Sequence, residues 1–399
     1  MKKNTNIKKL ENNIWKLYLC LVSYSFMFFV PIIVLFYQEN GLSLTQIMII
    51  QSVYFILFVL LEVPSGYFAD IFGRKKALML TGIFGSISMF TFAISTNFYH
   101  FLLAIILWAT AGAFISGADS ALLYDTLKDL KRDKEYKKIW GNVVFYYMIG
   151  VSFASIVGGL VGKIDYRYPF YLAMPFMILL IPLSLSLYEP QRHKTIFTKN
   201  YLLDLLKVIK LTLLKNNKLK WILIYSAVLT SFISTSYLLY QPYFQLSGLD
   251  IAYFGVVFAG FYAISGLSAK YSHLIEEKIG QKYSLILLVL LVGISYFLMS
   301  NLIYLFSFAF AFLFQFAKGF SSVVISDYIN KLADSKTRAT VLSIESLITK
   351  IASAVLSPFI GWIADIYSLE QAFNLSGILV LFFGAISLVL FWKSKSIRA

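Results

Sequence analysis

Long apolar runs separated by short polar segments dominate the chain. Twelve of these runs approach or exceed the length of about 20 apolar residues that a helix needs to cross a bilayer. The runs are continuous and lack period-two alternation, so they predict spanning helices and not the strands of a barrel. The predicted spans are residues 15–37, 46–69, 77–96, 98–127, 140–162, 169–187, 221–241, 251–272, 283–300, 302–328, 340–363 and 371–393.

Lysine and arginine are concentrated in alternate connections between these spans. One membrane side has only Lys163 and Arg167, whereas the other holds both termini and every other basic cluster. Basic residues favour the cytoplasmic side, so both termini are expected there, which agrees with an even number of spans. The first run is expected to be a retained helix and not a cleaved signal, because it is long enough to span and no small-residue cleavage site follows it.

The one long connection lies between the sixth and seventh spans. Polar residues at positions 200, 204, 207, 210 and 215 give residues 200–215 one polar and one apolar helical face. This pattern predicts a helix lying in the cytoplasmic interface. We therefore expect residues 1–187 and 221–399 to form two six-helix bundles joined by a linker at 188–220.

Composition narrows the possible classes of protein. Hydrophobic residues make up 59% of the chain and charged residues 14%, compared with about 25% charged residues in soluble domains. The net charge of +15 lies in connections between spans, so membrane topology explains it better than nucleic-acid binding. A single cysteine and three scattered histidines argue against a disulfide framework, a metal site or a cofactor cluster. An all-α protein of the inner or plasma membrane is expected.

The two halves repeat each other at a fixed offset of 207 residues. Tyr18 aligns with Tyr225, and the segment 37–42 aligns with 244–249 without a gap. The loop 70–75 aligns with 277–282 at the same offset. Six spans separate equivalent positions, so both halves have the same orientation, as in transporters with parallel repeats and a substrate site between them.

The connection after the second span reads Gly66-Tyr-Phe-Ala-Asp70-Ile-Phe-Gly73-Arg74-Lys75-Lys76. Here Gly66 permits close helix approach, Gly73 permits a tight turn, and Asp70 can accept from backbone amides and pair with Arg74. The segment resembles the Gly-x-x-x-Asp-x-x-Gly-Arg-Arg/Lys-Lys loop of the major facilitator superfamily. The resemblance implies a gate that holds the cytoplasmic ends of the second and eleventh helices together in the outward-open state. The alternative is that the basic residues only anchor the loop at the membrane surface.

Asp125 ends the fourth span at the same level. In members of the superfamily a carboxylate there completes a triad, which would consist here of Asp70, Arg74 and Asp125. The alternative is an ordinary charge at a helix end.

Other segments of the chain resemble the bacterial, efflux-like branch of this superfamily more loosely, and two departures weaken an assignment to its drug antiporters. Those antiporters carry an arginine in the fourth span, where this chain has Trp108 and no basic residue nearby. They also carry a glycine–proline pair in the fifth span, which Ala154-Ser155 replaces here.

Ionisable residues inside spans are costly and are therefore functional candidates. Glu62, Asp119 and Glu345 are candidates for proton coupling, because a low-dielectric site raises a carboxyl pKa towards the working pH. The alternative for Glu62 and Asp119 is that they brace the cytoplasmic gate. Lys318 and Lys350 are candidates for contact with substrate or for coupling, and the alternative is a structural pair between helices.

The helices expected to line a central cavity are rich in hydroxyl and aromatic residues. Candidates for substrate contact are Tyr24, Tyr237, Tyr240, Gln315, Lys318 and Lys350. Such side chains suit a partly apolar ligand. The alternative for any one of them is a contact between helices.

These features predict a monomeric secondary transporter that exports a drug-like or amphipathic molecule by alternating access, coupled to protons or sodium. The first alternative is proton-coupled import of a sugar, amino acid or peptide. The second is a transporter-like sensor or a lipid flippase. An enzyme is not expected, because the chain lacks a nucleotide loop, a nucleophile triad and a soluble domain.

Overall fold

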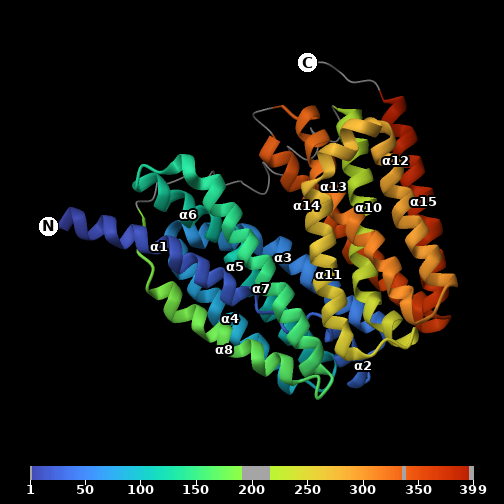
Figure 1. Cartoon of the computed structure of the whole chain (residues 1–399), viewed down its shortest axis with the longest axis horizontal. Coiled ribbons are helices and arrows are strands. Elements are labelled where there is room, and N and C mark those ends of the chain that lie inside the picture. The colour runs from blue at the N-terminus through green and yellow to red at the C-terminus, as the bar shows by residue number, and fades with distance from the viewer. Residues whose placement is uncertain (1, 191–215, 335–337, 395–399) are drawn as a thin grey trace. The chain divides into compact units, whose positions relative to one another are not determined.

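The computed structural model describes residues 2–190, 216–334 and 338–394. Within these ranges the chain is helical and contains no strand, which confirms the all-α prediction. The predicted interfacial helix at 200–215 lies outside the described residues. The main helices (Figure 1) are α1 (Lys2–Ser25), α2 (Ile33–Glu39), α3 (Leu44–Phe72), α4 (Arg74–Ile94), α5 (Phe98–Ile115), α6 (Ala118–Asp129), α7 (Tyr136–Gly162), α8 (Tyr168–Leu185), α10 (Asn217–Leu246), α11 (Ile251–Lys270), α12 (Ser272–Asn301), α13 (Ala311–Leu332), α14 (Arg338–Ile366) and α15 (Leu369–Lys393).

Eleven segments of the described chain are helical, long and apolar enough to cross a membrane. They correspond to the second to twelfth predicted spans. The first predicted span, 15–37, is divided between α1 and α2. Pro31 accounts for part of this break, because it lacks an amide hydrogen and disfavours a helical conformation at the residue before it.

Packing divides the chain into two units, which we call unit 1 and unit 2. Unit 1 comprises Met1–Leu42, Val53–Ile196 and Ile251–Ala259, and unit 2 comprises Ser43–Ser52, Phe197–Asp250 and Gly260–Ala399. Each unit therefore includes a short helical segment from the other half of the sequence. The start of α3 belongs to unit 2, and the start of α11 belongs to unit 1.

In unit 1, α4 packs between α5 and α8, and α1 packs against α6, α7 and α8. Glycines on α7 permit the closest approach. A Cβ at Gly158 would lie 1.8 Å from the backbone oxygen of Phe28, and one at Gly159 would lie 2.7 Å from the backbone nitrogen of Gly255. The glycine spacing in the fifth span is therefore a packing surface for the broken first span and for the start of α11.

In unit 2, α12 packs along α15, and α10 packs against α13, α14 and α15. Figure 1 shows α10, α12 and α15 side by side. The core is aromatic, with Tyr225, Tyr240 and Tyr296 fully buried. The Tyr225 hydroxyl donates to Leu285 O at 2.6 Å, and the Tyr296 hydroxyl donates to Phe232 O at 2.6 Å. These bonds satisfy polar groups that water cannot reach.

The 207-residue repeat is visible in the backbone. Gly41 and Gly248 both have φ of +80°, and each follows a helix whose last turn closes with equivalent hydrogen bonds. Gly73 and Gly280 also share positive φ, at +113° and +74°. A left-handed conformation suits glycine, so the repeated glycines mark repeated turns.

Candidate functional site

The segment Gly66–Lys76, which we call the gate loop, comprises the end of α3, Gly73 and the start of α4 in unit 1. Arg74 begins α4 and reaches across to α6, where its Nη1 donates to Ala121 O at 2.6 Å and to the carboxylate of Asp125. The two charged side chains are 17% and 14% exposed. A charge-assisted bond with this little exposure ties α4 to α6 more firmly than a surface ion pair would.

The start of α4 also carries a cap that the sequence did not predict. Glu189 accepts hydrogen bonds from the amides of Arg74 at 2.9 Å and Lys75 at 3.1 Å. The first amides of a helix lack partners within the helix and favour a negative charge. Gly73 leaves room for this cap, because a Cβ there would lie 2.9 Å from Glu189 Oε2. The only sign of this cap in the sequence was an acidic residue just after the predicted sixth span, at the same membrane side as the gate loop.

Three other predicted residues also lie in unit 1. Asp70 is half-buried in the last turn of α3, and Glu62 is exposed two turns earlier. Asp119 is half-buried in the first turn of α6, where its Oδ1 accepts from Ser120 N at 2.6 Å. It follows a break at Gly117, whose φ is +77°. The structure thus divides the predicted fourth span, 98–127, into α5 and α6. A Cβ at Gly66 would meet nothing within 4 Å, so no close approach occurs there in this structure.

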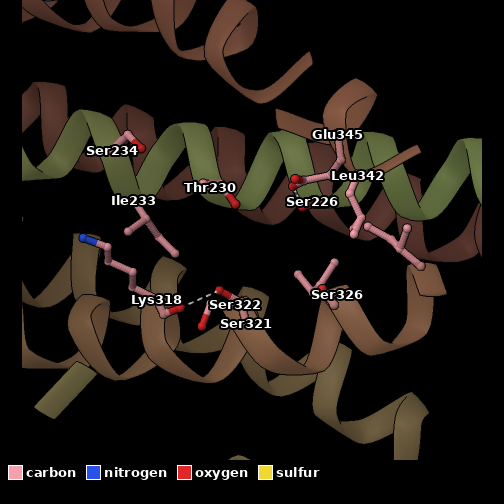
Figure 2. A pocket seen from close by; sticks show the side chains of 12 residues that line it. Ser226, Thr230, Ile233, Ser234, Lys318, Ser321, Ser322, Ser326, Leu342 and Glu345 are labelled. Atoms are coloured by element: carbon pink, nitrogen blue, oxygen red, sulfur yellow. Dashed lines mark hydrogen bonds between the residues drawn. The ribbon is translucent and has the colours of Figure 1, made fainter. Parts of the chain in front are cut away.

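Unit 2 contains a pocket of about 350 Å³ between α10, α13 and α14. Figure 2 shows one row of side chains on α10 facing another on α13. The α10 row includes Ser226, Thr230 and Ser234, and the α13 row includes Lys318, Ser322 and Ser326. Both rows follow a spacing of four residues, which places side chains on one helical face. This spacing is a signal from which the sequence could have predicted the pocket. The remaining lining residues are Ile233, Ser321, Ile325, Ile329, Leu342 and Glu345.

Lys318 is exposed to this pocket. Its Nζ lies 5.9 Å from the centre of the Tyr237 ring. Within the described ranges, Lys318 forms no ion pair with a carboxylate. An ammonium inside a spanning helix is costly without a counter-charge, so Lys318 favours an anion in the pocket.

Glu345 lies at the other end of the pocket, beside Ser226 (Figure 2). Its Oε1 accepts from Ser226 Oγ at 2.5 Å and from Thr349 Oγ1 at 3.4 Å. Ser226 and Ser234 are eight residues apart, which corresponds to about 12 Å along a helix. The pocket therefore has a carboxylate near one end and an ammonium near the other.

The remaining substrate-contact candidates lie outside the residues that line this pocket. Tyr240 and Gln315 are buried in the core of unit 2, where Gln315 Nε2 donates to the Tyr240 hydroxyl at 3.4 Å. Tyr24 stacks on Trp108 in unit 1, with ring centres 5.6 Å apart. Lys350 is half-buried on α14. Of the predicted residues, Lys318 and Glu345 are brought to one pocket, and Tyr237 lies against Lys318.

Among the described residues, no group of three His, Cys, Asp or Glu side chains is placed to hold a metal ion. The apolar helices, the repeated halves and the polar pocket define a multi-pass membrane protein of the transporter class.

Comparisons with known proteins give the family. The model of the Major Facilitator Superfamily matches residues 17–274 and 247–398. The chain belongs to this superfamily, and is therefore a transporter and not an enzyme.

Individual relatives are distant. The uncharacterized MFS-type transporter YxaM of Bacillus subtilis (strain 168) is 24% identical over 361 residues, which cover 88% of this chain and 89% of that protein. Multidrug resistance protein 1 of the same organism is 26% identical over 165 residues, or 41% of each chain. Among solved structures, the nucleoside transporter NupG is similar with a TM-score of 0.78 at 15% identity, covering 98% of this chain and 99% of that one. At this identity the structural likeness shows the fold alone.

Proposed function

We propose that this protein exports a small amphipathic molecule with an anionic group, in exchange for protons, by alternating access. The two halves, residues 1–187 and 221–399, would be the moving parts, joined by the linker 188–220. They would lie in the inner or plasma membrane of a bacterium with both termini in the cytoplasm. A monomer would be sufficient for transport, because the pocket is formed within one chain.

The observation that carries this proposal is Lys318, which has no carboxylate partner among the described residues and lies in a pocket that combines hydroxyl and branched apolar side chains. Lys318 would hold the anionic group of the substrate, with its charge further stabilised by the face of Tyr237. Ile233, Ile325 and Ile329 would contact the apolar part of the substrate. The serines and threonine would supply hydrogen bonds that fix its orientation.

Glu345 would carry the proton. In the deprotonated form its carboxylate accepts from Ser226, as the structure has it. In the protonated form it gains a donor and loses its charge. Its position in the same pocket as Lys318 lets substrate and proton influence each other through the charge of that pocket. Asp119 and Glu62 are secondary proton candidates in unit 1.

The similarity to Multidrug resistance protein 1 supports export over import, although it covers only 41% of this chain. The two hydroxyl rows support the alternative, which is proton-coupled import of a small polar nutrient. The direction of transport therefore distinguishes these two functions.

Transport into inside-out membrane vesicles tests the proposal, with fluorescein as an anionic probe and ethidium as a cationic one. We expect an acid interior to drive fluorescein accumulation that Lys318→Gln reduces about 10-fold or more, since bonds to charged groups are worth roughly 1.5–3 kcal/mol. Lys318→Arg keeps the charge and should retain most of the activity. Ethidium accumulation should be weak and insensitive to both variants.

Glu345→Gln tests coupling separately. We expect it to abolish the response to the pH gradient while fluorescein binding to the detergent-purified protein persists. Replacing sodium by potassium in wild-type vesicles should change nothing. Accumulation of ethidium alone, or an equal response of Glu345→Gln and wild type to the gradient, would contradict the proposal.

A further inference from the structure

The sequence around the end of α3 recurs at the end of α14. The first copy is Gly66-Tyr-Phe-Ala-Asp70-Ile-Phe72, and the second is Gly361-Trp-Ile-Ala-Asp365-Ile-Tyr367. Glycine, alanine, aspartate and isoleucine are identical in both copies, and both end in an aromatic residue. The separation of the two aspartates is 295 residues, from 70 to 365, so this recurrence is independent of the 207-residue repeat.

Asp365 caps the first turn of α3 within unit 2. Its Oδ1 accepts from Leu44 N at 2.9 Å, and its Oδ2 accepts from Thr45 N at 2.7 Å and from the Thr45 hydroxyl. The next amide, that of Gln46, donates to Ser43 Oγ at 3.3 Å, while Ser43 N donates to Gln46 Oε1 at 3.1 Å. Ser43, just before α3, and Gln46 in its first turn thus form a capping box.

This arrangement accounts for the first three amides of the helix. The capping box satisfies one of them, and the other two depend on a carboxylate from a helix that lies more than 300 residues away in sequence. The helix dipole adds a favourable interaction between its positive end and the Asp365 charge. The start of α3 is therefore complete only while the end of α14 is beside it.

Small residues continue the contact towards the membrane interior. A Cβ at Gly361 would lie 2.9 Å from Leu44 O and 2.8 Å from Met48 Cγ, so only glycine fits there. One turn further, Ser52 Oγ donates to Ala354 O at 2.7 Å. The contacts show that α3 and α14 run antiparallel here, with Asp365 at one end of α3 and Asp70 at the other.

We infer that Asp365 is a positioning residue for transport, acting as a latch at the membrane face opposite the gate loop. With the orientation proposed above, that face is the external one. The latch holds the outer ends of α3 and α14 together and favours the state that is closed to the outside. When these ends separate, the amides of Leu44 and Thr45 must bind water, so opening loses the contacts with Asp365.

A cysteine reporter at Ser52 tests this latch without substrate or gradient. Cys20, the chain's one cysteine, is fully buried, so the reporter can be introduced into the otherwise native protein. The measurement is the rate of labelling of Ser52→Cys by a membrane-impermeant methanethiosulfonate in right-side-out vesicles. We expect Asp365→Ala to raise this rate about fivefold, the size typical of a lost helix cap.

Two further variants and one control sharpen the result. Asp365→Asn keeps the size of the side chain and one acceptor and should raise labelling about twofold, as expected for the lost charge at a helix end. If Asp365→Ala does not fold, the labelling rate of Asp365→Asn tests the latch in its place. Glu370→Gln is the matched control, because Glu370 is in the first turn of the next helix and its backbone oxygen, not its side chain, accepts from Ser300. It should label like the reporter alone.

Labelling of the Asp365 variants at the control rate, or an equal increase in Glu370→Gln, would overturn the latch. Because this readout needs no substrate, its failure would leave the proposed export untouched. Conversely, failure of fluorescein transport in the wild type would leave the latch result standing.

Discussion

The fourth helical segments of the two halves start alike and then differ. Asn97 caps α5 and Tyr304 precedes the helical turn that leads into α13, again 207 residues apart. Beyond that point α5 breaks at Gly117 and resumes as α6, whereas α13 runs without a break through the equivalent Val324. The backbone frame is thus repeated, but the second half lacks the break.

The side chains differ more than the backbone. At the positions equivalent to Gln315 and Lys318, the first half has Trp108 and Ala111. Trp108 stacks on Tyr24, and Ala111 is fully buried. Where unit 2 has a lysine in a polar pocket, unit 1 has a buried alanine next to the stacked pair of Tyr24 and Trp108. With the proposed function, the second half would bind substrate, and the first half carries the gate loop.

The largest effect is expected from moving the pocket lysine to the first half. Ala111→Lys would place an ammonium in a fully buried position. Such a charge should destabilise the protein by on the order of 3–5 kcal/mol. Thermal unfolding in detergent would measure it, with Lys318→Ala as a control that should change stability little. A stable Ala111→Lys protein would mean that unit 1 conceals an equivalent pocket.

A smaller effect is expected at the two copies of the gate loop. Arg74→Ala leaves the Asp125 carboxylate and the Ala121 carbonyl without their shared donor. The cost should be about 2–3 kcal/mol, and transport should slow while ligand binding persists. Gln281, the equivalent residue in the second half, is exposed, so Gln281→Ala should stay within about 0.5 kcal/mol. Equal losses in both variants would contradict the assignment of the gate to the first half.

The smallest effect is expected at the helix break. Gly117→Ala forces a residue with a Cβ into a φ of +77°, which should cost roughly 1 kcal/mol. Gly141→Ala is the matched control in unit 1, because nothing lies within 4 Å of a Cβ there and its φ is not positive. It should be neutral or slightly stabilising. If Gly117→Ala matches this control in thermal unfolding, the break does not depend on glycine.

Apolar run length predicted most of the fold, because a bilayer requires helices of a set length. The gate loop was also visible, since Gly73, Arg74 and Asp125 are close to span ends whose positions are known. The helix caps supplied by Glu189 and Asp365 could not be predicted from the sequence, because only tertiary packing brings these carboxylates to another helix. Tyr240 illustrates the limit for the pocket. A tyrosine on a polar helix fits a cavity and a core equally well, and here it is in the core.

The break in the first predicted span also bears on how the protein enters the membrane. α1 is not among the helices apolar enough to span, and α2 has only seven residues. Neither piece is a strong insertion signal by itself, since recognition depends on a long apolar stretch. We therefore expect the first span to be retained in the bilayer only once α3, the strongly apolar helix that follows, has been synthesised. Biogenesis of this transporter would then begin with a pair of spans and not with the first span alone.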